Sequence, residues 1–349
     1  MDRRKATLGG AVIGVVAGVV GVVVLASPAG AGPKPALPAT TPQALVQSVL
    51  TASVPSMSGT VAIQNNLGLP AVPGIPELAN GTSQLRVWAD GTGRTRVSVP
   101  TASSEQTIVD DGHTLYTWDS TDRTVSESPV AKDKPGPQPD AGTPTDPASL
   151  ARELVGALQN SSDITVDGTD TVAGQPAYDL VLTPKANQRT LLRQVTIAVD
   201  ANKHIPLQLT VLGDNTSTPA VQVGFSSVDY GPQQSSLFTF TPPPGATVTQ
   251  HAKSDQGKAQ HAATQIEPKI VGTGWDTVAI VKLPGSTQDT GKNGDPLSLA
   301  RQFGTPVSGS WGSGWAIGTN IGTAVITSDG RIAVGLVPQQ VLTEALGSK

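Results

Sequence analysis

Short runs in which apolar and polar residues alternate dominate the middle of the chain. Valine, leucine or isoleucine takes every second position, with threonine, glutamine or small residues between them. Because successive side chains of a strand point to opposite faces, each run predicts a strand with one apolar and one polar face. Turn-forming pairs such as Asp90-Gly91, Asp111-Gly112 and Asp167-Gly168 separate the runs. The pattern predicts a long antiparallel sheet of consecutive strands.

Two other segments have the periodicity of amphipathic helices. Thr41-Pro42 and Asp146-Pro147 each place a capping residue before a proline at the first helical position. The apolar stripes that follow are Leu45, Val46, Val49 and Leu50 in the first segment, and Leu150, Leu154, Val155 and Leu158 in the second. These stripes predict two helices that cover the apolar side of the sheet.

The first 31 residues have the pattern of an export signal. Basic residues precede an uncharged run from Leu8 to Ala26, and Ala29-Gly30-Ala31 supplies a small-x-small cleavage site. The run also approaches the roughly 20 residues that cross a bilayer, and its glycines recur at the spacing of packed membrane helices. Residues 1–31 are therefore predicted to be a cleaved signal peptide or a retained anchor. Both alternatives place the rest of the chain outside the cytoplasmic membrane.

Changes in composition divide the remainder of the chain. Residues 32–40 are a proline-rich spacer, 41–249 hold the alternating runs, 250–267 form a polar linker, and 268–349 form a small α+β unit. Within the first unit, the proline-rich residues 132–139 predict a loop ahead of the second helix. The elements predicted for the last unit are strands at 275–283, 315–317, 323–327 and 332–337, a helix at 295–303, and a terminal helix after Pro338 with Val341, Leu342, Ala345 and Leu346 on one side.

Composition excludes several classes of function. A formal net charge of −4 offers no basic surface for nucleic acid, and the absence of cysteine excludes disulfides and thiolate chemistry. The chain has only four histidines. Ser313 lies between glycines but lacks the spacing of a nucleophile elbow, and no phosphate-binding glycine loop is present. The chain is therefore predicted to bind rather than to catalyse, with no cofactor and no metal.

One stretch places titratable residues side by side. Asp110, Asp111 and His113 would suit a metal site or an acid–base pair, but Asp111-Gly112 is also a two-residue hairpin turn. In that turn Asp110 faces His113, and Val109, Ile108 and Thr107 pair with Thr114, Leu115 and Tyr116. With no third ligand nearby in sequence, the stretch is predicted to be a turn.

The strand segments also carry motifs that resemble a known superfamily. A strand ends in VD (199–200), the next begins with IPL (205–207), a third contains VGFS (223–226), and FTFTPP (238–243) closes the series. Upstream, DDGHTLYTWD (110–119) and SGTV (58–61) are similar to the hairpin and first strand of the same group. From Thr41 to Thr249 the chain resembles the LolA/RseB superfamily of exported lipid- and lipoprotein-handling proteins.

The resemblance implies a fold and a site. The fold is α+β: a half-open antiparallel β-barrel whose apolar concave face is lidded by helices, with a smaller C-terminal α+β domain like the two-domain RseB and MucB. The face and its lid imply the ligand-binding residues Leu45, Val49, Val61, Ile63, Leu85, Val87, Val97, Leu150, Leu154, Leu158, Leu180, Leu182, Val195, Ile197, Leu207, Leu209, Val221, Val223 and Phe225. Alternatively, the helices close over a packed core that holds no ligand.

Two functions follow from the resemblance. The first is an extracytoplasmic, non-enzymatic carrier or chaperone for a lipid or an acylated lipoprotein of the cell envelope. The second is an RseB-like regulator that binds an anti-sigma factor or another membrane regulatory protein through its C-terminal unit. A carrier alone has little use for residues 268–349, so that unit distinguishes the two functions.

Overall fold

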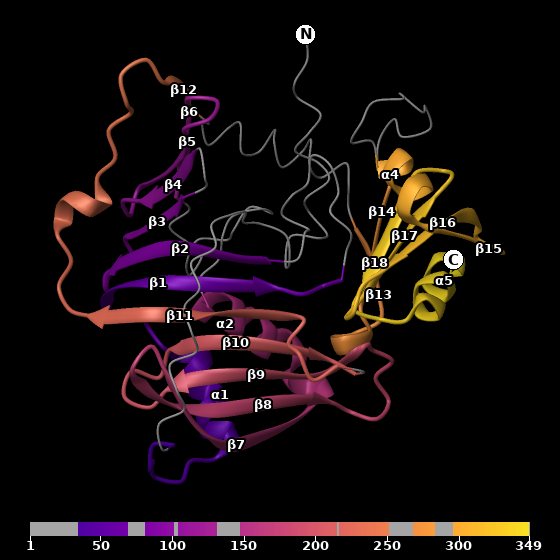
Figure 1. Ribbon diagram of the computed structural model, residues 1–349, viewed down its shortest axis with the longest axis horizontal. Coiled ribbons are helices and arrows are strands. Elements are labelled where there is room, and N and C mark those ends of the chain that lie inside the picture. The colour runs from indigo at the N-terminus through magenta and orange to yellow at the C-terminus, as the bar shows by residue number, and fades with distance from the viewer. Residues whose placement is uncertain are drawn as a thin grey trace.

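Two β-sheets form the framework of the protein. The structure is a computed structural model that describes residues 34–68, 81–100, 104–130, 147–214, 216–250, 268–282 and 296–348. The predicted signal or anchor, the loop at 132–139, the cap Asp146, the first residue of the helix predicted at 295–303, and residues 251–267 of the predicted linker lie outside the described residues. The larger sheet has twelve strands and the smaller has six. Figure 1 shows the smaller sheet beside one end of the larger one.

The larger sheet is open, not a closed barrel. Its strand order is β12-β6-β5-β4-β3-β2-β1-β11-β10-β9-β8-β7. The strands are β1 (Ser56–Asn65), β2 (Gly81–Asp90), β3 (Thr95–Pro100), β4 (Glu105–Asp110), β5 (Thr114–Asp119), β6 (Thr124–Pro129), β7 (Ser162–Val172), β8 (Gln175–Pro184), β9 (Leu192–Asp200), β10 (Pro206–Gly213), β11 (Val221–Tyr230) and β12 (Thr247–Gln250).

This order corrects the prediction of consecutive antiparallel strands in two places. β1 lies in the middle of the sheet and pairs with β11, so that two meanders are joined there. β12 returns to pair with β6 in parallel, and it includes Gln250, the first residue of the predicted linker. Every other neighbouring pair is antiparallel, as predicted.

A bulge marks the junction of the two meanders. The register between β1 and β11 shifts at Thr60/Val61, where Val61 pairs with Phe225. Gly59 leaves room for the ring of Phe225, because a Cβ there would lie 2.8 Å from a ring carbon and 2.6 Å from the carbonyl oxygen of Ser227. The glycine thus permits the close approach of the two strands.

Two helices pack on the half of the sheet that contains β7 to β11. α1 (Pro42–Thr51) begins as predicted, with the Thr41 side chain accepting a hydrogen bond from the Ala44 amide at 3.2 Å. α2 (Pro147–Leu158) packs against α1, β10 and β11. In Figure 1 both helices lie behind these strands. Their apolar stripes explain their position, since an amphipathic helix buries one face against the sheet.

The second unit is an antiparallel sheet with the order β13-β14-β18-β17-β16-β15. Its elements are β13 (Lys269–Val271), η4 (Gly274–Asp276), β14 (Val278–Lys282), α4 (Pro296–Phe303), β15 (Thr305–Gly309), β16 (Gly312–Gly318), β17 (Thr323–Thr327), β18 (Arg331–Gly335) and α5 (Gln339–Gly347). The predicted terminal helix is confirmed, with Val341, Leu342, Ala345 and Leu346 buried. The predicted strand at 275–283 is wrong at its start, because Trp275 lies in the 3-10 turn η4. The strand predicted at 332–337 ends at Gly335.

Trp275 anchors the second unit to the first. Its side chain is 3% exposed and belongs to the hydrophobic core of the larger sheet. The indole nitrogen donates to Ser162 Oγ at 2.8 Å, and the backbone amide donates to Gln188 Oε1 at 3.0 Å. Ile321 joins the same core from the second unit. Next to it, the backbone N–H of Asn320 donates to the Leu67 carbonyl at 3.0 Å. Two side chains of the second unit therefore pack in the core of the first, and the other buried apolar side chains of the second unit form clusters of their own.

The spacer ahead of α1 lies against β7 and β8. The Thr169 hydroxyl donates to the Pro35 carbonyl at 2.8 Å, and the Tyr178 hydroxyl donates to the Pro38 carbonyl at 2.9 Å. Asp179 of β8 lies in the same region. Burial, and after it the negative charges of Asp170 and Asp167, raise its pKa to about 6, while Lys34 opposes the shift.

Asp179 predicts a pH dependence of stability. Its folded-state pKa is above the unfolded value, so the folded protein binds the proton more tightly between about pH 4 and pH 6. We expect the contribution of Asp179 to the free energy of unfolding to fall as the pH rises through this window. Asp179→Asn should remove that slope in urea titrations at several pH values, whereas Asp163→Asn, on exposed Asp163 of β7, should keep it. Equal slopes in wild type and Asp179→Asn would contradict the assignment.

Candidate functional site

The strand ladder assembles one apolar face across the larger sheet. Val61 of β1 pairs with Leu85 on one side and with Phe225 on the other. The same register continues through Val87–Val97 toward β4, and through Val223–Leu209–Ile197–Leu180 toward β8. Since paired residues point to the same side, these side chains form a single surface, called the apolar face below.

All the residues predicted for the face and its lid meet in one hydrophobic cluster. Most are buried, and Ile63, Val97, Leu150 and Leu154 are half-buried and pack against the others. The residues that are at most 8% exposed are Leu45, Val49, Val61, Leu85, Val87, Leu158, Leu180, Leu182, Val195, Ile197, Leu207, Leu209, Val221, Val223 and Phe225. On α2, Ala151 and Val155 are both 0% exposed, and Leu158 is 7% exposed. Ala151 was not predicted, because alanine adds little to a hydrophobic pattern.

The lid covers only part of the apolar face. The main contacts of α1 and α2 with strands are with β7, β8, β10 and β11. Val87, Val97 and Val99 continue the face on β2 and β3, beyond these contacts. The apolar face therefore has a region beneath the helices and a region beside them.

The hairpin at Asp110–His113 is confirmed as a turn, with a corrected register. Asp110 pairs with Leu115 and Val109 with Tyr116, so the turn residues are Gly112 and His113, not Asp111 and Gly112. The predicted pairs of Thr107, Ile108 and Val109 with Tyr116, Leu115 and Thr114 are each wrong by two residues. Only Gly112 of the turn has a positive φ, at 89°.

The carboxylates of Asp110 and Asp111 accept hydrogen bonds from backbone amides within that hairpin. The Asp110 side chain accepts from the Gly112 amide at 2.8 Å, and the Asp111 side chain accepts from the amides of His113 and Thr114. Burial raises the pKa of Asp110, and the hydrogen bond from Gly112 opposes that shift. Among the residues that the structure describes, no three His, Asp or Glu side chains gather as metal ligands would.

The VD motif at 199–200 supports a second turn. Asp200 is fully buried, and its Oδ1 accepts from the amides of Asn202 and Lys203 at 2.7 and 2.8 Å. Its Oδ2 accepts from the Tyr230 hydroxyl at 2.5 Å. Burial and this bond raise the pKa of Tyr230 well above its usual range. The buried carboxylate is satisfied in this way, and it ties the end of β9 to the end of β11.

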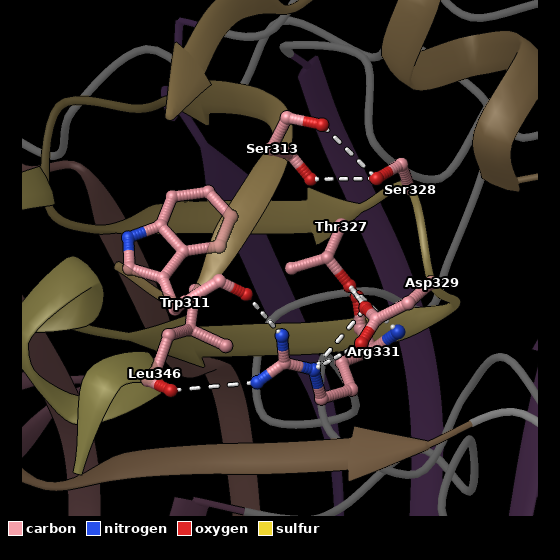
Figure 2. Close-up of polar contacts among 7 residues, drawn as sticks. All are labelled: Trp311, Ser313, Thr327, Ser328, Asp329, Arg331 and Leu346. Carbon is pink, nitrogen blue, oxygen red and sulfur yellow. Dashed lines mark hydrogen bonds and ion pairs between the residues drawn. The ribbon is translucent and has the colours of Figure 1, made fainter. Parts of the chain in front are cut away.

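Ser313 belongs to a structural contact on the second unit. Its hydroxyl lies 3.1 Å from the Ser328 hydroxyl, and no histidine or carboxylate of the described residues bonds to it (Figure 2). Nearby, Arg331 donates to the Asp329 carboxylate at 2.9 Å and to the Trp311 and Leu346 carbonyls at 2.6 and 3.4 Å. This arginine fixes the β15–β16 turn and the end of α5 to β18.

A hollow of about 710 Å³ lies between the β15–β16 turn and α5. Its one charged lining residue is Glu344, which is paired with Arg189 of the first unit at 2.6 Å. The Arg189 guanidinium holds the pKa of Glu344 below its usual value. The charged residue of the hollow is thus already paired with an arginine of the first unit. The apolar face is the stronger candidate site.

In the described part of the chain, no helix is long and apolar enough to span a bilayer. No protein-family model matches the sequence. No curated protein matches it significantly.

Several solved structures are similar to this chain at low sequence identity. The complex of Pseudomonas aeruginosa MucA and MucB has 17% identity and a TM-score of 0.44, covering 88% of this chain and 95% of that chain. A LolA superfamily protein from Nitrosomonas europaea has 13% identity and a TM-score of 0.27, covering 58% and 99%. An uncharacterised conserved protein from Thermus thermophilus has 12% identity and a TM-score of 0.36, covering 60% and 98%.

At these scores the likeness assigns no activity to the chain. The mostly-β architecture with few helices is confirmed by the structure itself. The chain is thus similar to MucB and to LolA-superfamily proteins, with a large open sheet and a second, smaller one.

Proposed function

We propose that the protein is an extracytoplasmic, non-enzymatic carrier that holds acyl chains of a lipid or lipoprotein on its apolar face. The larger sheet serves as a half-open barrel, and α1 and α2 serve as its lid. The observation that carries the proposal is the extent of the face, which runs without interruption from β2 through β1 and β11 to β8. The lid covers only part of it.

The composition of the lid suits a cover that an acyl chain can displace. The buried side of α2 combines Ala151 and Val155 with Leu158, so that its contacts with the sheet are apolar and can be replaced by those of an acyl chain. Each methylene of a ligand buried on the face contributes about 0.8 kcal/mol, and an acyl chain replaces the lost lid contacts. Half-buried Val97 marks the region beside the lid where a chain would lie.

Filling this region tests the proposal. Val97→Phe adds volume to the face beside the lid, and we expect it to abolish uptake of a fluorescent fatty acyl probe. Overpacking should lower the free energy of unfolding by about 1–3 kcal/mol, leaving the protein folded. The measurements are probe fluorescence and mass spectrometry of lipid that copurifies with protein secreted from cells.

The control places the same ring on the opposite, polar face. Thr165→Phe on β7 changes an exposed residue, so that probe uptake should match wild type. A wild-type protein that copurifies with no lipid and takes up no probe, yet unfolds cooperatively, would show that the helices close over a filled core.

A second function is favoured by the docked second unit. Trp275 and Ile321 insert into the core of the first unit, so a protein that displaces the second unit would disturb the core beneath α2. This arrangement supports a regulator in which a membrane protein binds residues 268–349. MucB, to which the chain is similar, is recorded in complex with MucA. Crosslinking in intact envelopes, with a probe on α5, would distinguish a regulator that captures one membrane protein from a carrier.

A further inference from the structure

The lid helix carries a cation whose inner nitrogen has no partner. The Nε of Arg152 on α2 is buried, and among the described residues it is the one buried side-chain nitrogen or oxygen without a hydrogen bond. An unsatisfied buried donor destabilises a protein, and native structures contain few of them. Packing alone therefore does not explain why the Nε of Arg152 is buried without an acceptor.

Arg152 lies at the border of the apolar face. It follows Ala148 by four residues and precedes Val155 by three, so these side chains are neighbours on the helix surface. Ala148 and Val155 are 3% and 0% exposed, whereas Arg152 is half-buried. The guanidinium is thus held where the apolar contact of the lid meets its solvent-facing side.

Three other arginines near the sheet have partners. Arg94 pairs with Asp90 at 2.6 Å, Arg96 donates to the Leu237 carbonyl, and Arg123 donates to the Pro244 carbonyl. The guanidinium of Arg152 makes no ion pair with a described residue. A guanidinium presents a planar fork of donors that matches phosphate, and a desolvated fork gains most from a charged acceptor.

We propose that Arg152 binds the phosphate of an anionic diacyl phospholipid whose chains lie on the apolar face. This inference rests on the proposed function and names its substrate class. A cation whose buried Nε is unsatisfied, beside an apolar surface, complements one negative headgroup joined to acyl chains. The face spans many strands about 4.8 Å apart, which gives width for two chains.

The test compares two lipids with the same acyl chains. Fluorescently labelled phosphatidylglycerol and diacylglycerol, which has no phosphate, are titrated into the full mature chain, and we expect wild type to bind phosphatidylglycerol about tenfold tighter, as one charge-assisted hydrogen bond would provide. Arg152→Gln should lose this preference and retain diacylglycerol binding. Arg152→Lys should retain part of it, because the charge remains without the planar fork.

Arg193→Gln is the matched control, since it removes the same charge from an exposed position on β9 and should keep the preference. Arg152→Met gives a readout without lipid: removal of the unsatisfied donor should leave the lipid-free protein at least as stable in urea. Equal affinities of wild type for the two lipids, or a preference that survives in Arg152→Gln, would overturn the role of Arg152 and leave the carrier function standing. Binding of neither lipid would overturn both.

Discussion

Trp275→Ala is expected to lower the free energy of unfolding by about 3–5 kcal/mol, the range for removing a buried aromatic side chain. The indole is 3% exposed and is the largest side chain that the second unit contributes to the shared core. Its loss also removes the donor to Ser162 Oγ. Urea denaturation monitored by circular dichroism measures the change, and hydrogen exchange at the end of α2 should increase.

Trp275→Phe separates packing from hydrogen bonding in this contact. Phenylalanine keeps most of the apolar contact, while Ser162 loses one donor but still donates to the Leu158 carbonyl at 2.7 Å. We expect a cost of about 1 kcal/mol, typical of a single hydrogen bond. If Trp275→Ala left both stability and exchange unchanged, the two units would not be coupled through this residue.

Ile197→Glu is expected to destabilise the protein by about 3–5 kcal/mol, because it leaves a charge buried without a partner. Ile197 is 0% exposed and pairs with Leu180 on β8 and Leu209 on β10. Far-ultraviolet circular dichroism and the yield of secreted protein measure the effect. An acyl ligand cannot be tested with this variant, since it is expected to unfold.

The adjacent residue supplies the control. Thr196 points to the polar face, where it accepts a hydrogen bond from the Gln194 side chain at 3.2 Å. Thr196→Glu should cost about 0.5 kcal/mol or less, as surface substitutions usually do. Similar losses in the two variants would mean that the sheet does not separate an apolar from a polar face at β9.

The side on which each strand residue lies could be predicted from the sequence, and the partner of each strand could not. Alternation assigns Val61, Ile197 and Phe225 to one face, and the structure places them together. The pairing of β1 with β11 depends on contacts far apart in the chain, which a local pattern does not encode. The error at the Asp111 hairpin has a related cause: a shift of two residues leaves every side chain on its predicted face.

Short elements and single contacts also could not be predicted from the sequence. β13 and β15 have three and five residues, too few for a clear period of two. The predicted strand starts at Trp275, but Gly274, with a positive φ of 66°, begins a 3-10 turn that includes Trp275. Arg152 gave no signal, because a solvated arginine and a buried one look the same in a helical pattern.

The pairing of β1 with β11 has a consequence for how the chain folds. The hydrogen bond from the Ser226 hydroxyl to the Thr60 carbonyl joins residues that are 166 positions apart in the sequence. The strands within each meander instead pair with close neighbours in sequence. Such long-range closure slows folding, and an unpaired strand edge invites association with other chains. As the chain lengthens from its N-terminus, one edge of β1 has no partner until residue 230 is available. The central strand of the finished sheet is therefore its exposed edge during most of folding, and a holdase that protects it would raise the yield of the protein.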